Sequence, residues 1–211
     1  MLASLAAMFG CKNGNCAPRR QMGAVGAINV TRADPPPLLD QVAAGFTLST
    51  GESLLEASRS RLLVLVFLRH FGCTFTRQLL RGLEEFQHSA TELGGQLVLV
   101  HMLKSGGEIR YLGGHDDVAR IADPRCELYR AFGLGRGGFL ELFGPRVWWL
   151  GAIAIFKGCG VGHLAGDGLQ MPGAFLFRDG EILAAQRAKS AADMPDIPGL
   201  FAELRNPTSA S

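Results

Sequence analysis

The hydrophobic pattern of the chain is clearest between residues 62 and 93. It begins with an unbroken apolar run over Leu62–Leu68, which predicts a strand that is buried on both faces. A short turn follows and ends at Cys73. From there apolar residues recur every three or four positions as far as Leu93, and Gly94-Gly95 follows, which predicts an amphipathic helix. The pattern therefore places a cysteine where a buried strand meets a helix.

Two further strands and a helix are predicted in the middle of the chain. The apolar run over residues 96–102 predicts a second buried strand, and a right-handed crossover makes it parallel to the first. Residues 119–122 predict a short strand. Asp123 suits an N-cap and Pro124 a first-turn position, so we expect a helix after them that ends near Gly133.

A β-hairpin is predicted towards the C-terminus. Asp179-Gly180 lies between two apolar runs, so we expect residues 174–178 and 181–187 to pair as antiparallel strands. A last helix is expected near residues 197–204. The order of elements predicts an α/β protein with one mixed sheet and helices on both faces, which is thioredoxin-like architecture. Met171-Pro172 stands just before the hairpin, where this architecture has a cis proline beside its reactive cysteine.

The predicted domain occupies residues 37–205, with a flexible tail over 1–36 and a short tail over 206–211. Residues 134–168 are rich in glycine and aromatic side chains and are too long for a simple connection. They predict an insertion before the hairpin. It is either a segment packed against the sheet or a lid over the cysteine, in which Trp148-Trp149 would supply apolar contact area.

Composition narrows the class of protein. The chain has 211 residues, of which 47% are hydrophobic, which suits a single domain with a substantial core. A net charge of +2 is too small to indicate nucleic acid or an anionic membrane surface as a partner. The apolar N-terminal run has no Lys or Arg before it and no clear cleavage site after it, so we expect no export signal. Residues 147–156 are too short to span a membrane.

The cysteines point to a reducing compartment. The chain has an odd number of them, widely scattered, which is neither a disulfide framework nor a zinc knuckle. We therefore expect a cytoplasmic protein. His115, His163 and Asp167 have no metal-ligand spacing, so neither a metal nor a cofactor is predicted. The cysteines are Cys11, Cys16, Cys73, Cys126 and Cys159.

Several segments resemble a known family. They are FLRHFGCTFTRQLL, ADPRCELYRAFGLGRG, LFGPRVWW, GVGHLAGDGLQMPGAFLFRDGEI and AAQRAKSAADMPD. In this order they are similar to the peroxiredoxin-like AhpC/TSA redoxins of the thioredoxin superfamily, in particular the selenoprotein-L-like and peroxiredoxin-like 2 group. The resemblance covers about residues 60–200. It implies a thioredoxin fold and a thiol-based redox activity with peroxide or a disulfide as the electron acceptor.

Cys73 is the predicted nucleophile. A peroxidatic thiol attacks the O–O bond as a thiolate and becomes a sulfenic acid. The start of the helix favours the thiolate, and so would cations at Arg77, one helical turn later, and at Arg69 and His70, just before. The resemblance adds two candidates, namely Pro172 beside the cysteine and Arg187 as a basic residue at the end of a strand.

The turn departs from the family pattern in two ways. The peroxiredoxin pattern PxxxTxxC is missing, because Val66 and His70 stand where proline and threonine would be. Family members often carry Cys-x-x-Cys at the turn, whereas this chain has Thr76 at the second position. A local disulfide is therefore excluded. The Thr76 hydroxyl either donates a hydrogen bond to the thiolate or caps the helix.

A one-Cys cycle remains, in which the second thiol comes from elsewhere. It is an external reductant, either glutathione or a thioredoxin-like protein, or one of Cys159, Cys126, Cys11 and Cys16. We therefore predict a one-Cys thiol peroxidase or oxidoreductase. The alternative is a non-catalytic thioredoxin-fold binding module in which Cys73 is an inert buried thiol. The resemblance also allows an isomerase or reductase acting on a lipid endoperoxide.

Overall fold

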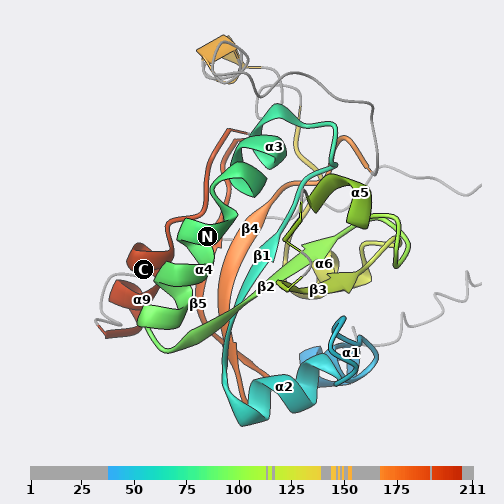
Figure 1. Ribbon diagram of the computed structural model, residues 1–211, viewed down its shortest axis with the longest axis vertical. Helices are drawn as coiled ribbons and strands as arrows, with labels where there is room; N and C mark the ends of the chain where they lie inside the picture. Colours follow the sequence, from blue (N-terminus) through green and yellow to red (C-terminus); the bar gives the residue numbers. More distant parts are fainter. Residues whose placement is uncertain are drawn as a thin grey trace, which may run out of the picture. The chain divides into compact units, whose positions relative to one another are not determined.

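A mixed five-stranded sheet forms the centre of the protein (Figure 1). The computed structural model describes residues 38–112, 114–115, 117–138, 144–145, 147, 149, 152–153, 167–190 and 192–205. The strand order is β3-β2-β1-β4-β5. The strands are β1 (Leu62–Phe67), β2 (Gly95–His101), β3 (Ala119–Ala122), β4 (Gly173–Arg178) and β5 (Glu181–Arg187). Strands β1, β2 and β3 are parallel, whereas β4 and β5 form the antiparallel hairpin, which confirms the predicted fold class.

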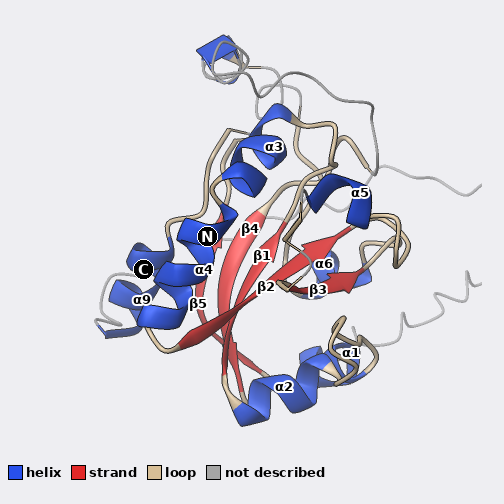
Figure 2. Cartoon of the chain, viewed as in Figure 1, coloured by secondary structure: helices blue, strands red, loops and turns tan. Residues whose placement is uncertain are grey.

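Helices cover both faces of the sheet (Figure 2). One face packs against residues of α1, α2 and α6, and the other against residues of α3, α4, α5 and α9. The helices are α1 (Leu39–Ala44), α2 (Leu54–Ser60), α3 (Thr74–Arg81), α4 (Leu83–Glu92), α5 (Ile109–Leu112), α6 (Glu127–Ala131) and α9 (Ile197–Arg205). No helix of the described residues is long and apolar enough to cross a membrane.

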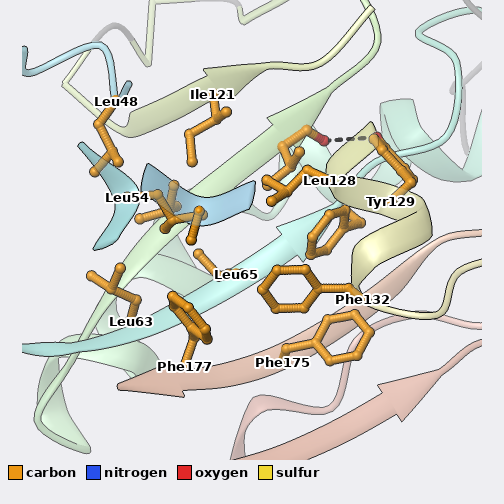
Figure 3. Packing of buried hydrophobic residues seen from close by; sticks show 14 of the residues in the cluster. Leu48, Leu54, Leu63, Leu65, Ile121, Leu128, Tyr129, Phe132, Phe175 and Phe177 are labelled. Atoms are coloured by element: carbon orange, nitrogen blue, oxygen red, sulfur yellow. Dashed lines mark hydrogen bonds between the residues drawn. The ribbon is translucent and has the colours of Figure 1, made fainter. Parts of the chain in front are cut away.

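Strand β1 joins the two halves of the core. All six of its residues are buried, as the continuous apolar run predicted. Because side chains alternate along a strand, Leu65 and Phe67 enter one cluster, whereas Val64 and Val66 enter the other. Figure 3 shows the first cluster, in which the rings of α6 and the hairpin lie over β1. The ring centroids of Phe67 and Phe132 are 5.0 Å apart.

The helix predicted after Cys73 is broken into two. Helix α3 ends at Arg81, Gly82 follows, and α4 begins at Leu83. The backbone N–H of Gly82 donates to the carbonyls of Gln78 and Leu79. Glycine has low helix propensity, so the chain leaves the helix easily here, although the apolar stripe continues on both sides.

Two local predictions are wrong. The described residues contain no cis peptide bond, so the Met171–Pro172 bond is trans. Trans is also the more stable isomer of an X-Pro bond. The N-cap of α6 is Cys126 in a left-handed conformation, not Asp123. Asp123 lies before the helix but still pairs the backbone donors at the start of α6, because its carboxylate accepts hydrogen bonds from the N–H groups of Glu127, Leu128 and Tyr129.

Candidate active site

The candidate site lies where β1 ends and α3 begins. The backbone N–H of Leu68 still donates to the carbonyl of Val100, so the chain follows β2 to the end of the strand. The turn then closes with a 2.9 Å bond from the Cys73 N–H to the His70 carbonyl. Cys73 is the N-cap of α3 and is 7% exposed. The thiol therefore lies at the positive end of the helix dipole of α3.

The guanidinium of Arg69 contacts this thiol directly. Its Nη1 lies 3.2 Å from the Sγ of Cys73. Its Nη2 donates to the carbonyl of Gly168 at 2.6 Å, and its Nε donates to the carbonyl of Gln170 at 3.4 Å. Arg69 is 8% exposed. A buried cation is thus held against the sulfur by two carbonyls that lie about 100 residues further along the chain.

The loop that supplies these carbonyls is itself fixed. The side-chain amide of Gln170 is buried and donates to the carbonyls of Leu134 and Gly135. The Gln170 backbone also forms a bridge with Arg136, which makes a 2.7 Å ion pair with Asp167. Burial opposes ionisation of Asp167, but hydrogen bonds from the Leu169 N–H and from Arg136 leave the pKa of its carboxyl lowered. The carbonyls that hold Arg69 are therefore positioned by the segment that follows α6.

His70 does not supply a second cation. Burial, together with the neighbouring Arg69, lowers the pKa of His70 from 6.5 to about 4. Its Nδ1 is buried and has no hydrogen-bond partner among the described residues. The imidazole is consequently neutral near pH 7, and the expectation that it adds positive charge beside Cys73 was wrong.

A small cavity brings two predicted site residues together. Thr76 and Pro172 line a hollow of about 40 Å³, together with Arg69. A cavity needs a volume of roughly 10–15 Å³ to hold one water molecule, so this hollow is large enough for a molecule of the size of hydrogen peroxide. Its apolar wall is formed by Phe75, Leu79, Ala188, Met194 and Pro195.

Residues 81–190 match a family model described as AhpC/TSA antioxidant enzyme. The chain belongs to this family. The matched residues cover just over half of the chain and begin after Cys73. A redox function is therefore supported at the level of the AhpC/TSA family, whereas the narrower subgroup stays a prediction.

Solved structures of redox proteins resemble the AhpC/TSA chain at low identity. Peroxiredoxin Q from Xanthomonas campestris is 18% identical over 78% of this chain and 93% of its own, with a TM-score of 0.42. A putative thiol:disulfide interchange protein DsbE from Chlorobium tepidum is 18% identical over 75% and 90%, with a TM-score of 0.47. AhpC from Mycobacterium tuberculosis is 10% identical over 73% and 75%, with a TM-score of 0.42. No curated protein matches.

Two other predicted site residues of this AhpC/TSA protein make their described side-chain contacts elsewhere in the fold. Arg187 donates to the carbonyl of Phe132 at 3.1 Å and lies over the ring of Phe175, on the face of the sheet that α6 covers. Arg77 lines a separate hollow between α3 and α5. A catalytic role for either arginine stays a prediction.

The two described cysteines lie in different clusters. Cys73 packs with Phe75 and Ala192, whereas Cys126 belongs to the cluster on the α6 face. Burial, followed by the charges of Asp123 and Asp167, raises the pKa of the Cys126 thiol. Both cysteines are free. The other candidate resolving thiol, Cys159, lies outside the described residues, as do the tail cysteines and Trp148.

Sequence reasoning missed the residues that hold the site together. Tyr129 is fully buried, and its hydroxyl lies 2.6 Å from the carbonyl of Leu68 and 3.0 Å from that of Val100. It therefore ties α6 to the ends of β1 and β2, immediately before Arg69. A tyrosine among apolar helix positions was the available signal, but its partners are 61 and 29 residues away. Within the described residues, no group of His, Cys, Asp or Glu side chains could hold a metal ion.

Proposed function

We propose that this protein reduces a peroxide or a disulfide through Cys73 as its single nucleophile. The contact of Arg69 with Sγ carries the proposal, because a buried guanidinium stabilises the negative charge that the attacking sulfur must bear. The N-terminus of α3 acts in the same direction. The cysteine content suits a reducing compartment, and we propose the cytoplasm.

With a peroxide, the thiolate sulfur attacks one oxygen. The S–O bond forms as the O–O bond breaks, and the leaving alkoxide or hydroxide takes up a proton. Cys73 is then a sulfenic acid. An external thiol attacks its sulfur, water leaves, and a second thiol releases Cys73 by exchange. With a disulfide acceptor, Cys73 attacks one sulfur and displaces the other as a thiolate.

The small cavity at Arg69, Thr76 and Pro172 supports a small substrate. Thr76 and Pro172 line it with Arg69, and the space of about 40 Å³ matches a hydroperoxide group better than a large organic molecule. We propose that the Thr76 hydroxyl hydrogen-bonds the bound oxygens. Because Thr76 has no sulfur, the second thiol comes from glutathione, from a thioredoxin-like protein, or from Cys159 or Cys126.

The experiment is intact mass spectrometry after one equivalent of hydrogen peroxide, with dimedone present to trap sulfenic acid. We expect one adduct, which peptide mapping places on Cys73 and which disappears in Cys73→Ser. Cys126→Ser is the matched control, because that thiol is also buried, and it should keep the adduct. The absence of both an adduct and a disulfide at Cys73 on the folded wild-type chain, or an adduct that survives in Cys73→Ser, would refute a nucleophilic Cys73.

The second candidate function is a non-catalytic binding module. The observation in its favour is the 7% exposure of Cys73, since free cysteine is often simply a buried apolar residue. The rate at which iodoacetamide alkylates Cys73 distinguishes the redox enzyme from the binding module. If Cys73 is alkylated no faster at pH 6 than a free thiol, and Cys73→Ser keeps the biological effect of the protein, the binding module is the better account.

A further inference from the structure

A positively charged hollow lies on the far side of α3 from the substrate cavity. It has a volume of about 450 Å³ and lies between α3 and α5, and Phe71 from the turn before Cys73 contributes to its lining. Three arginines and a histidine line it, together with two aromatic rings: Arg77, Arg81, Arg110, His115, Phe71 and Tyr111. It shares no described lining residue with the cavity at Thr76 and Pro172.

We propose that this hollow binds the carboxylates of a small thiol reductant of tripeptide size. The proposal rests on the proposed function, because the ligand is the thiol that attacks the Cys73 sulfenic acid. The substrate and the reductant would then approach the turn from opposite sides of α3.

Two arginines of the hollow, Arg77 and Arg110, have charge to offer a ligand. No acidic side chain is among its described lining residues, and within the described chain neither Arg77 nor Arg110 pairs with a carboxylate. Arg77 is half-buried. Other arginines do pair with carboxylates, in Arg61–Glu52, Arg120–Glu108, Arg125–Glu127, Arg136–Asp167 and Arg178–Asp179.

The aromatic rings give the hollow a rigid wall. Phe71 and Tyr111 are stacked, with centroids 4.8 Å apart and planes inclined by 16°. The guanidinium of Arg110 lies 4.8 Å from the centroid of the Tyr111 ring. This cation–π contact fixes the arginine, and its planar fork matches a carboxylate with two parallel hydrogen bonds. A positioned guanidinium recognises a carboxylate at a lower entropic cost than a free side chain.

The hollow is continuous with the reactive turn. Phe71 comes two residues before Cys73, and the Arg77 N–H donates to the Cys73 carbonyl at 3.0 Å. A volume of about 450 Å³ lies in the range of small-molecule sites, roughly 300–1,000 Å³. A peroxide uses little of this space and none of its charge, whereas a tripeptide with two carboxylates uses both.

Binding is tested without redox chemistry. S-methylglutathione keeps both carboxylates of glutathione but cannot reduce anything, and it is titrated into the full reduced chain by calorimetry. We expect saturable binding that weakens as ionic strength rises. The diester of the same compound, which lacks the negative charges, should bind at least about tenfold more weakly. Equal affinity for acid and diester overturns the proposal.

Charge reversal locates the site. Arg110→Glu should weaken binding of S-methylglutathione by about tenfold or more, since it replaces an attraction by a repulsion. Arg178→Glu is the matched control, because Arg178 is also exposed but lies on the hairpin, and it should bind as the wild type does. Arg110→Gln, which keeps a polar end group but removes the charge, should give an intermediate loss. Unchanged binding in both Arg110 variants overturns the proposal.

The proposed nucleophile and the proposed reductant site can be refuted independently of each other. A dimedone adduct on Cys73 without binding of S-methylglutathione overturns the reductant site and leaves the nucleophile. If a thioredoxin-like protein regenerates the Cys73 thiol and glutathione does not, the reductant site is likewise overturned and the nucleophile remains. Binding that depends on Arg110, in a chain that forms no sulfenic acid, overturns the nucleophile and leaves a site for carboxylates.

Discussion

Replacing Arg69 by methionine removes the cation at the thiol and keeps an apolar side chain of similar length in its place. A hydrogen bond to a charged group contributes about 1.5–3 kcal/mol net. Each 1.4 kcal/mol corresponds to a factor of about ten in rate. Because the Nη1 of Arg69 lies 3.2 Å from Sγ and the pair is buried, we expect Arg69→Met to lower the rate of Cys73 alkylation at pH 6 by about 10- to 100-fold.

The assay is the rate of iodoacetamide labelling at Cys73, followed by peptide mass spectrometry. The variant also leaves the carbonyls of Gly168 and Gln170 without their donor, so some stability is lost, roughly 1–3 kcal/mol. Arg69→Lys keeps the charge and should recover part of the rate. Tyr129→Phe controls for lost stability, because Tyr129 is not bonded to the sulfur. Wild-type labelling in a folded Arg69→Met protein would refute the role given to the guanidinium.

Three further predictions concern stability. Tyr129→Phe leaves the Leu68 carbonyl without its hydroxyl donor and should lower the free energy of unfolding in urea by about 1–2 kcal/mol; an unchanged midpoint would contradict it. The pKa of His70 is lowered from 6.5 to about 4 in the folded protein, so the unfolded chain binds the proton more readily as the pH falls. The contribution of His70 to the free energy of unfolding is complete above pH 6.5, and it should fall by about 1–2 kcal/mol towards pH 4 after allowance for solvent screening. The variant His70→Gln should remove this dependence on pH. Gly173→Ala would place a Cβ 3.1 Å from the backbone oxygen of Gln186, so we expect a loss of about 1–3 kcal/mol in thermal unfolding, whereas a melting temperature equal to that of the wild type would show that the strands can separate there.

The elements that could be predicted are those whose signals are local. Strand β1 is apolar at every position because it is buried on both faces. The hairpin turn needs two residues with positive φ, and Asp179 and Gly180 adopt 53° and 81°. The break at Gly82 escaped prediction because the helical period of apolar residues is nearly the same on both sides. Periodicity identifies a buried face but does not show whether the helix axis is continuous.

The site could be predicted only in part, because only some of its contacts join residues that are close in the chain. The position of Cys73 follows from its neighbours in the chain. The contact of Arg69 with Gly168 and Gln170 depends on how segments about 100 residues apart meet. Arg187 is a second example. It ends a strand, and its pairing with Gly173 places it on the face that carries Phe175, where it donates to the Phe132 carbonyl, a partner 55 residues away that the sequence does not indicate.

The position of the Arg69 guanidinium beside the sulfur depends on residues that never contact the sulfur. Gln170 fixes its loop by donating from a buried amide to the carbonyls of Leu134 and Gly135. That loop presents the two carbonyls that orient Arg69, and Arg69 in turn donates to Cys73. Guanidinium groups have five donors in a rigid plane, so fixing two of them fixes the direction of the third. Gln170 therefore helps to position the Arg69 guanidinium, and the contact between Arg69 and Cys73 depends on the packing of the segment after α6.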